Sequence, residues 1–248
     1  MTLEQFFAEN REVAVAFSGG VDSAYLLYAA TRYAARVKAY YVSTAFQPEF
    51  ELADARRLAD ELGADMLVLH VDVLSNSAVT ANPSDRCYHC KNTLFRQILR
   101  AAENDGFPVL LDGTNASDDA GDRPGMRALR ELSVRSPLRE CGLTKAEIRR
   151  LSKEAGLFTW DKPAYACLAT RIRTGEEITL QKLKQTEKAE GFLFGLGFRD
   201  FRVRMVGNTA KLELREADLP LLLENREKIV TELRKDYDGV LLNLEVRK

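Results

Sequence analysis

Residues 13–30 read VAVAFSGGVDSAYLLYAA, and the pattern changes twice within this stretch. It begins inside a run of small apolar residues, 12–17, typical of a buried strand, and it ends inside a helix-like segment, 23–35. A glycine turn between a strand and a helix lets the backbone approach an anion, at which the first N–H groups of the helix point. The stretch therefore predicts a phosphate-binding loop; the alternative is a turn that needs glycine for its geometry alone.

The six residues of this turn indicate what kind of phosphate site it would form. They are Ser18, Gly19, Gly20, Val21, Asp22 and Ser23. The two serines add hydroxyl donors at the ends of the loop. Asp22 would repel a bare phosphate, but it suits a Mg²⁺ ion that bridges phosphate oxygens. The lysine of the common nucleotide P-loop is missing from the motif.

Strand and helix patterns alternate along the first two-thirds of the chain. Further strands are expected at 37–44, 65–73 and 108–115, and helices at 48–64, 90–106 and 143–157. Thr144 and Glu147 have the spacing of a capping box at the start of the last helix. This alternation predicts an α/β fold with a doubly wound, mostly parallel sheet.

The pattern changes after about residue 175. A charged helix is expected at 179–191, two half-buried strands at 201–206 and 210–216, a long amphipathic helix at 219–237 and a closing strand at 239–246. We therefore expect a first domain over residues 1–175 and a small α+β domain over residues 176–248.

The bulk properties are those of a globular enzyme. The 248 residues are 46% hydrophobic and 29% charged, which is ordinary for that class. A net charge of −1 gives no overall attraction for nucleic acid. No stretch approaches the ~20 apolar residues of a membrane span, and the N-terminus lacks the basic and apolar segments of a secretory signal. We expect a cytoplasmic protein with neither nucleic acid nor membrane as its partner.

Four cysteines are too few for a disulfide scaffold at this length. Cys87 and Cys90 form a C-x-x-C pair, whose spacing allows two thiolates to share one metal ion or one face of a cluster. The pair alone leaves zinc, iron–sulfur and redox use open, as well as two unrelated thiols. Cys141 has no partner motif nearby and is expected to be structural.

Cys167 lies in a loop of small residues just before Arg171 and Arg173. Guanidinium groups favour a nearby thiolate and bind phosphate groups. This context predicts a reactive thiol next to a substrate phosphate; the alternative is a small buried core residue.

A strand, the motif S-G-G-x-D-S and a helix in this order resemble the PP-loop ATP pyrophosphatase superfamily. Its members cleave ATP between the α- and β-phosphates and adenylate a substrate, so the resemblance implies a loop that holds pyrophosphate without a P-loop lysine. It also implies that Thr44 lies near the adenine. Gly113, Thr114 and Asn115 would line the nucleotide cleft at the carboxyl ends of the strands.

Longer motifs resemble one family of this superfamily, the LarE-type ATP-dependent sulfur transferases. They are FSGGVDS, NPSDRCYHCK, DGTNASDDAGDRPGMRAL, VRSPLRECGLTKAEIR, KPAYACLATRI and FRVRMVGNTAKLEL, in family order over roughly residues 10–220. The resemblance implies an enzyme that uses ATP and Mg²⁺ to adenylate a carboxylate of pyridinium-3,5-biscarboxylic acid mononucleotide. The carboxylate then becomes a thiocarboxylate for the nickel-pincer cofactor.

The resemblance gives Cys167 the position of the thiolate that attacks the acyl-adenylate. In the sacrificial version of the reaction, this cysteine surrenders its own sulfur. With Cys87 and Cys90 the chain resembles a three-cysteine variety, in which three thiolates hold a [4Fe-4S] cluster and an open iron carries the sulfide that is delivered. We favour the cluster-dependent version.

The resemblance also implies substrate-binding residues, which are Arg171, Arg202, Arg204, Glu190 and Glu213. The two arginines on one expected strand would grip the substrate phosphate, unless they form a solvated strand face. The two glutamates would bind a metal or the substrate near the sulfur, unless they are ordinary surface carboxylates. Three residues would shape the nucleotide site or order a loop through Asx turns: Asp119, Asp122 and Arg123.

Three rival functions stay open. A tRNA-thiolation enzyme of the superfamily would need a basic RNA surface or an appended RNA-binding domain, and neither shows in the sequence of this near-neutral chain. An amidating enzyme such as NAD synthetase would leave three cysteines without a role. A module that binds nucleotide and a metal or cluster as a sensor would not release AMP and pyrophosphate. We further expect a small-molecule nucleotide substrate and a homo-oligomer, and no motif points to a particular sulfur donor.

Overall fold

The computed structural model describes residues 1–118 and 124–247. Asp119, Asp122 and Arg123 lie outside the described residues. The chain divides into two compact units. The N-terminal unit comprises Met1–Val73 and Asp85–Lys162, and the C-terminal unit comprises Leu74–Ser84 and Pro163–Lys248. The predicted division into domains at residue 175 stays a prediction.

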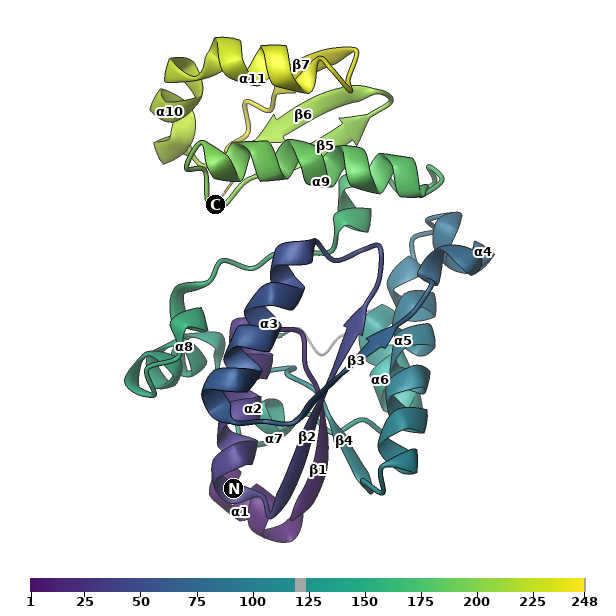
Figure 1. Cartoon of the computed structure of the whole chain (residues 1–248), viewed down its shortest axis with the longest axis vertical. Helices are drawn as coiled ribbons and strands as arrows, with labels where there is room; N and C mark the ends of the chain where they lie inside the picture. Colours follow the sequence, from purple (N-terminus) through teal and green to yellow (C-terminus); the bar gives the residue numbers. More distant parts are fainter. Residues whose placement is uncertain (119–123, 248) are drawn as a thin grey trace. The chain divides into compact units, whose positions relative to one another are not determined.

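The N-terminal unit is built on a parallel sheet of four strands (Figure 1). The strands are β1 (Glu12–Ala16), β2 (Arg36–Ser43), β3 (Met66–His70) and β4 (Val109–Leu111), in the order β3-β2-β1-β4. Val15 of the central strand pairs with Ala39 on one side and with Leu111 on the other. The expected α/β class with a parallel sheet is confirmed.

Helices cover both faces of this sheet, because its strands have buried apolar side chains on both faces. Val13 and Val15 belong to one apolar core and Ala14 to another, because successive side chains of a strand point to opposite faces. The first core contains residues of α1 (Leu3–Glu9), α2 (Val21–Tyr33), α3 (Glu49–Leu62), α7 (Pro137–Glu140) and α8 (Lys145–Glu154). The second contains residues of α5 (Arg86–Asn104), beside which α6 (Pro124–Glu131) lies in Figure 1.

The strand order reverses between β1 and β4, since β2 and β3 lie on one side of β1 and β4 lies on the other. Ligands of open α/β sheets bind outside the carboxyl ends of the strands at such a reversal. The segments that follow β1 and β4 are 17–20 and 112–115, which contain the motifs SGG and DGTN. The topology therefore places both predicted nucleotide-binding segments at one edge of the sheet.

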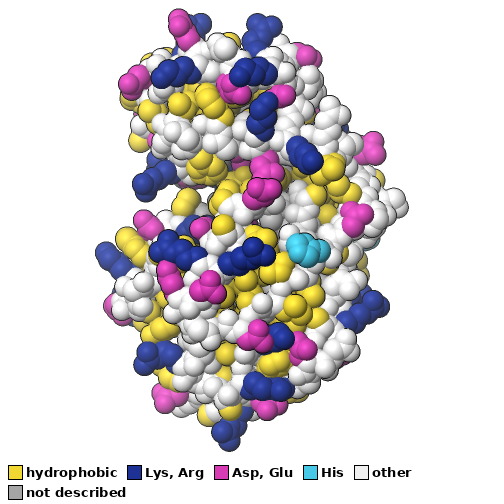
Figure 2. All heavy atoms as spheres, viewed as in Figure 1, with side chains coloured by type: hydrophobic (Ala, Val, Ile, Leu, Met, Phe, Trp, Pro, Cys, Tyr) yellow, Lys and Arg dark blue, Asp and Glu magenta, His cyan; other side chains and the backbone are white. Residues whose placement is uncertain are grey.

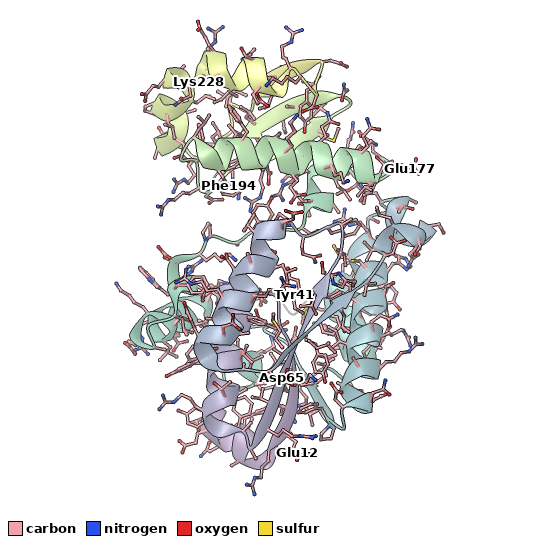
Figure 3. The ribbon with its side chains drawn as sticks, in the orientation of Figure 1. Glu12, Tyr41, Asp65, Glu177, Phe194 and Lys228 are labelled. Atoms are coloured by element: carbon pink, nitrogen blue, oxygen red, sulfur yellow. The ribbon has the colours of Figure 1, made fainter. Side chains whose placement is uncertain are left out.

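The C-terminal unit contains a sheet of three strands, in the order β5-β6-β7. The strands β5 (Arg202–Val206) and β6 (Thr209–Glu213) form the expected antiparallel hairpin, and β7 (Gly239–Leu242) pairs with β6 in parallel. The long helix α9 (Leu180–Gly195) packs against β5. Phe194, labelled in Figure 3, contacts Phe201 at the start of that strand, with ring centroids 4.8 Å apart.

The prediction of a single long helix over 219–237 is wrong. The structure has α10 (Leu219–Glu224) and α11 (Arg226–Leu233), separated at Asn225. The Nδ2 group of Asn225 donates to the carbonyl of Leu221 at 3.1 Å, and side-chain bonds of this kind compete with a continuous helix. A short helix, α4 (Ser77–Thr80), completes the described helices of this unit. None of the helices that the structure describes is long and apolar enough to cross a membrane.

Candidate active site

The predicted phosphate loop leaves the first N–H groups of α2 without a side-chain cap. Gly20 is the N-cap residue and has no side chain that could accept from them. Gly19 has a φ of 72°, and a Cβ atom there would lie 3.3 Å from the Cβ of Ala55 on α3. Gly19 therefore allows the loop to pack closely against α3. Gly20 leaves the N–H groups at the start of α2 available to an anion.

The two serines of the loop bond to each other. The hydroxyls of Ser18 and Ser23 are 3.0 Å apart, and the Ser23 hydroxyl also accepts from the Ser18 N–H at 3.2 Å. The Ser23 hydroxyl in turn donates to the carbonyl of Gly20 at 3.2 Å. These bonds hold the loop in one shape before any ligand binds.

The segment after β4 contacts the start of α2 through the backbone. A Cβ atom at Gly113 would lie 2.9 Å from the backbone nitrogen of Ser23. The strand expected over 108–115 ends at Leu111, because the side chain of Asp112 accepts from Thr114 Oγ1 at 2.5 Å and from Ser136 Oγ at 2.6 Å and so orders a loop. The structure thus places Gly113 against the backbone at the start of α2. That this segment lines the nucleotide cleft stays a prediction.

Thr44 and Asn115 order the turns in which they lie. The Thr44 hydroxyl donates to Gln47 Oε1 at 2.6 Å and accepts from the N–H of Phe46 at 3.0 Å. The Asn115 side chain accepts from the N–H of Ser117 at 2.8 Å. Their predicted contacts with the nucleotide stay predictions.

Asp22 has one engaged and one unengaged carboxylate oxygen. Its Oδ2 accepts from Nζ of Lys145 at 2.6 Å. Its Oδ1 is buried and has no hydrogen-bond partner among the described residues. Burial raises the pKa of this carboxyl, an effect that Lys145 opposes. A buried carboxylate oxygen without a donor suits a hard divalent cation, so the residues present fit Mg²⁺.

The capping box at Thr144 and Glu147 is confirmed, and it explains the position of Lys145. The Thr144 hydroxyl accepts from the N–H of Glu147, whose carboxylate accepts from the N–H of Thr144 at 2.9 Å. This motif starts α8 at Lys145, the residue that reaches Asp22. The sequence indicated the helix start but not this ion pair.

Lys162 is a further residue at the loop that sequence reasoning did not single out. Its Nζ atom lies 3.4 Å from the carbonyl oxygen of Gly19 and 2.7 Å from Oδ2 of Asp54. The signal that could have found it is its place in the motif KPAYACLATRI. A cation therefore borders the loop even though the motif itself lacks a lysine.

Cys87 and Cys90 lie in the first two turns of α5, at positions three apart that are neighbours on a helix surface. Cys87 is exposed and Cys90 is half-buried. The Nη2 group of Arg86 donates to Sγ of Cys87 at 3.8 Å. Nε2 of His89, which lies between the two cysteines in the sequence, is 3.3 Å from Oδ2 of Asp85. In the described parts of the chain, no three His, Cys, Asp or Glu side chains are grouped as a metal site.

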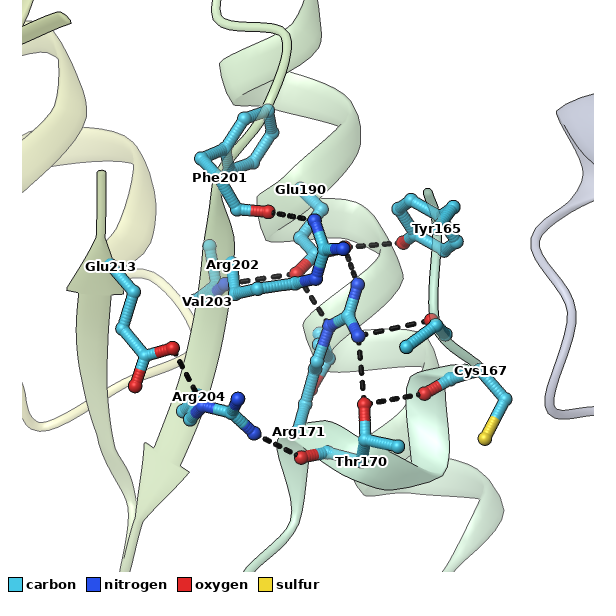
Figure 4. A network of polar contacts seen from close by, with 12 residues as sticks. Tyr165, Cys167, Thr170, Arg171, Glu190, Phe201, Arg202, Val203, Arg204 and Glu213 are labelled. Atoms are coloured by element: carbon cyan, nitrogen blue, oxygen red, sulfur yellow. Dashed lines mark hydrogen bonds and ion pairs between the residues drawn. The ribbon is translucent and has the colours of Figure 1, made fainter. Parts of the chain in front are cut away.

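Cys167 begins a short 3-10 turn, Leu168–Arg171, in the C-terminal unit (Figure 4). Its carbonyl oxygen accepts from the N–H of Thr170 at 2.9 Å and from the Thr170 hydroxyl at 2.8 Å. Its side chain is half-buried, and Figure 4 shows the sulfur pointing away from Arg171. The carbonyl oxygen of Cys167 thus makes two of the bonds that hold this turn.

A buried ion pair anchors this turn to α9. The guanidinium of Arg171 forms two bonds with the carboxylate of Glu190, at 2.8 and 3.0 Å, and both side chains are at most 1% exposed. The same carboxylate accepts from the N–H of Val203 at 2.9 Å and from the Tyr165 hydroxyl. Burial disfavours the charge of Arg171, but Glu190 outweighs this effect and the pKa of Arg171 is raised.

Arg202 and Arg204 have different surroundings. Arg202 is buried and donates to the carbonyls of Phe201 and Ala164, both at 2.5 Å. Burial, together with the charge of Arg171, lowers its pKa. Arg204 has a 37% exposed side chain and donates to Glu213 at 2.7 Å. All five residues predicted to bind the substrate thus lie in one unit, and their contacts with a substrate stay predictions.

Comparisons with known proteins agree with this architecture. Residues 4–118 match the asparagine synthase family. The chain is 32% identical over 235 residues to pyridinium-3,5-bisthiocarboxylic acid mononucleotide synthase of Lactiplantibacillus plantarum, which covers 94% of this chain and 85% of that protein. The chain belongs to the family of this mononucleotide synthase. The predicted resemblance to LarE-type enzymes, which are transferases of the PP-loop superfamily, is confirmed.

Two other proteins are also similar to this chain. An uncharacterized protein of Synechocystis is 39% identical over 215 residues, which cover 86% of this chain and 80% of that protein. A tRNA-specific 2-thiouridylase of Thermotoga petrophila is 27% identical over 191 residues, covering 59% of this chain and 52% of that protein. The sequence identity to the thiouridylase is lower than that to the mononucleotide synthase, and it extends over fewer residues.

The charge on the surface of this LarE-family chain is mixed. On the face that Figure 2 shows, acidic and basic side chains are interspersed over both units. Among the described residues seen there, no single-sign surface stands out of the kind that nucleic-acid-binding proteins carry.

Gly113→Ala is expected to impair nucleotide binding in this LarE-family chain. The added methyl would meet the backbone nitrogen of Ser23 at 2.9 Å, so the first turn of α2 or the loop after β4 must shift. Overpacking of this kind costs about 1–3 kcal/mol of folding free energy. We expect a lower melting temperature and ATP binding weakened at least ~10-fold, measured by thermal unfolding and calorimetric titration. The control is Gly191→Ala, where an added Cβ would meet nothing within 4 Å beyond its chain neighbours and the backbone of its own helix, and it should leave binding unchanged.

Proposed function

We propose that this LarE-family chain is an ATP-dependent sulfur transferase that acts on pyridinium-3,5-biscarboxylic acid mononucleotide. It adenylates one carboxylate of this substrate and converts it to a thiocarboxylate for the nickel-pincer cofactor. The observation that carries the proposal is the uncapped start of α2 behind Ser-Gly-Gly-Val-Asp-Ser, in a chain that matches a bisthiocarboxylic acid mononucleotide synthase over 94% of its length. A nucleotide substrate brings the phosphate groups that such a loop binds.

In the first step a carboxylate oxygen of the substrate attacks the α-phosphorus of ATP. The bond between this phosphorus and the oxygen that bridges to the β-phosphorus breaks, and pyrophosphate leaves with the electron pair. The N–H groups at the start of α2 and the hydroxyls of Ser18 and Ser23 are the donors available to the pyrophosphate. Asp22 would hold Mg²⁺, which, when bound, neutralises negative charge on the phosphate oxygens.

In the second step sulfur replaces AMP at the activated carboxyl carbon. In the sacrificial version Cys167 is the proposed nucleophile, because a thiolate readily displaces a good leaving group such as AMP. In the sacrificial version, the resulting thioester loses its Cβ–S bond and dehydroalanine remains in the protein. In the version we favour, Cys87, Cys90 and Cys167 are the ligands of a [4Fe-4S] cluster, whose open iron would carry the sulfide.

The surroundings of the five substrate-binding candidates suggest a division of roles. Arg204 and Glu213 are the candidates with the less buried side chains, and we assign to Arg204 the phosphate of the mononucleotide. Arg171 and Glu190 are engaged with each other and buried, so we assign them to holding the turn that starts at Cys167. A cytoplasmic location and a homo-oligomeric assembly stay predictions.

The experiment is an anaerobic reaction of the full chain with ATP, Mg²⁺ and the mononucleotide. We expect release of AMP and pyrophosphate together with a thiocarboxylate product, detected by mass spectrometry. An amidating enzyme would show no sulfur in the product, a tRNA-thiolation enzyme would act on tRNA instead, and a sensor module would release no pyrophosphate.

The cluster is tested with single cysteine variants. Cys87→Ala, Cys90→Ala and Cys167→Ala are each expected to abolish a broad absorption near ~400 nm in protein reconstituted with iron and sulfide. The control is Cys141→Ala, since Cys141 packs against the core of the N-terminal unit and should not affect the absorption. Sulfur transfer that survives loss of Cys87 and Cys90 would refute the cluster and leave the sacrificial version.

A further inference from the structure

The cation next to the phosphate loop comes from the far end of the N-terminal unit. Lys162 lies 143 positions beyond Gly19 in the chain, yet its Nζ atom is 3.4 Å from the Gly19 carbonyl oxygen. The same atom lies 2.7 Å from Oδ2 of Asp54, and the lysine side chain is only 14% exposed. The ammonium group is therefore held at the edge of the loop and not in bulk solvent.

The backbone of Lys162 is fixed, whereas its ammonium group can change partners. The Lys162 N–H donates to the carbonyl of Thr159 at 3.1 Å. Arg149 on α8 donates to the carbonyls of Trp160 and Lys162, at 2.6 and 2.8 Å. The ammonium group lies at the end of a flexible four-carbon stem, so it can move by several ångströms without any change in these bonds.

Two lysines border the loop, and their partners separate their roles. Lys145 binds Asp22, which is the proposed Mg²⁺ ligand within the motif. Lys162 binds Asp54 of α3, which lies outside the motif. A bound triphosphate brings more negative charge than one carboxylate, so an ammonium group at the loop edge gains by exchanging one for the other.

We propose that Lys162 is a phosphate-binding residue that replaces the lysine missing from the motif. Its ammonium group leaves Asp54 and binds the pyrophosphate portion of ATP on the Ser-Gly-Gly-Val-Asp-Ser loop. This inference rests on the proposed function, because it requires ATP on this loop. Asp54 then acts as a resting partner that holds the ammonium group in position when ATP is absent.

The opposing explanation is that the Lys162–Asp54 pair only fastens α3 to the segment after α8. The two explanations differ in what they predict for Asp54. If the pair is structural, loss of either partner has the same effect on ATP binding. If Lys162 binds phosphate, loss of Lys162 weakens binding, whereas loss of the Asp54 charge leaves it unchanged or tightens it.

The experiment is a calorimetric titration of the full chain with α,β-methylene-ATP and Mg²⁺. This analogue cannot be cleaved between its α- and β-phosphates, so the result does not depend on sulfur transfer. We expect Lys162→Gln to weaken binding about 10- to 100-fold, the worth of one charge-assisted hydrogen bond. Lys162→Arg should recover most of this loss, and Asp54→Asn should bind at least as tightly as the wild type.

A matched control exists at the opposite end of the same sheet. Lys38 lies near the start of β2 and is 3.0 Å from Asp105, with a side chain that is 20% exposed. Lys38 also lies 3.3 Å from Asp65, so Lys38→Gln removes the ion pairs of a similarly buried lysine away from the loop, and it should leave ATP binding unchanged. Melting temperatures of all variants show the structural contribution of each pair separately.

Three results would overturn the inference. Binding of Lys162→Gln within about twofold of the wild type would refute it, as would equal weakening by Lys162→Gln and Asp54→Asn. A wild-type chain that does not bind the analogue would refute the proposed function as well. The first two results leave the proposed function intact, so the two failures can be told apart.

Discussion

Cys167→Ser is expected to abolish sulfur transfer and to leave adenylation intact. In the sacrificial version a serine hydroxyl cannot supply sulfur. In the version we favour, the substitution removes one of the three thiolates that would hold the cluster. Thiocarboxylate formation should fall by at least ~10³-fold in either version, a lower bound for the loss of a group that the reaction requires. Pyrophosphate should still be released at the wild-type rate, because the loop proposed to bind it belongs to the N-terminal unit, whereas Cys167 belongs to the C-terminal unit. The measurements are pyrophosphate release and mass spectrometry of the product.

The structure explains why this substitution tests chemistry rather than folding. The carbonyl oxygen of Cys167 makes the two bonds with Thr170, and serine retains it. Cys141→Ser is the control for replacement of a thiol as such. A Cys167→Ser protein that still forms thiocarboxylate would contradict the assignment. The mass of the wild-type protein after one turnover then distinguishes the two versions, because only the sacrificial one loses the elements of H₂S.

Glu190→Ala is expected to cause the largest loss of folding stability among the site residues. The substitution removes the acceptor of three groups and leaves the guanidinium of Arg171 buried without its counter-ion. Breaking a buried ion pair by removing one partner typically costs 3–5 kcal/mol. The measurement is the free energy of unfolding from urea titration followed by fluorescence.

Two variants show that the buried charge is the cause. Glu154→Ala removes an exposed partner, since the Arg150–Glu154 pair is about 60% exposed on both sides, and it should cost at most about 1 kcal/mol. The double variant Arg171→Met/Glu190→Leu replaces the pair by apolar groups and should recover much of the loss. A cost below 1 kcal/mol for Glu190→Ala would contradict the role of this carboxylate.

Local patterns in the sequence predicted the elements that carry the phosphate loop. The apolar run before Ser18, the paired glycines and the capping box at Thr144 are each built from residues within a few positions of one another. Their geometry depends mainly on neighbouring residues, so a strand, a turn and a helix start can be predicted from them. The long helix was wrongly predicted for a related reason, because its amphipathic pattern continues through Asn225 although that side chain interrupts the helix.

Contacts between distant parts of the chain could not be predicted in this way. The sequence placed Arg171 and Glu190 among substrate ligands, and only the fold shows that they form a buried pair. Likewise, nothing near the loop indicates that Lys145 reaches Asp22. Such partners are selected by the packing of whole elements, and the residue types alone are equally compatible with a solvated charge.

By itself, the sequence determined the α/β class and the family, and it predicted the phosphate loop. Each of these follows from local spacing or from motifs that persist along the chain. Only the tertiary structure decided that Gly113 touches the start of α2 and that the motif without a lysine has Lys162 beside it. The physical reason is that a parallel sheet brings the carboxyl ends of distant strands, and the segments that follow them, to one edge.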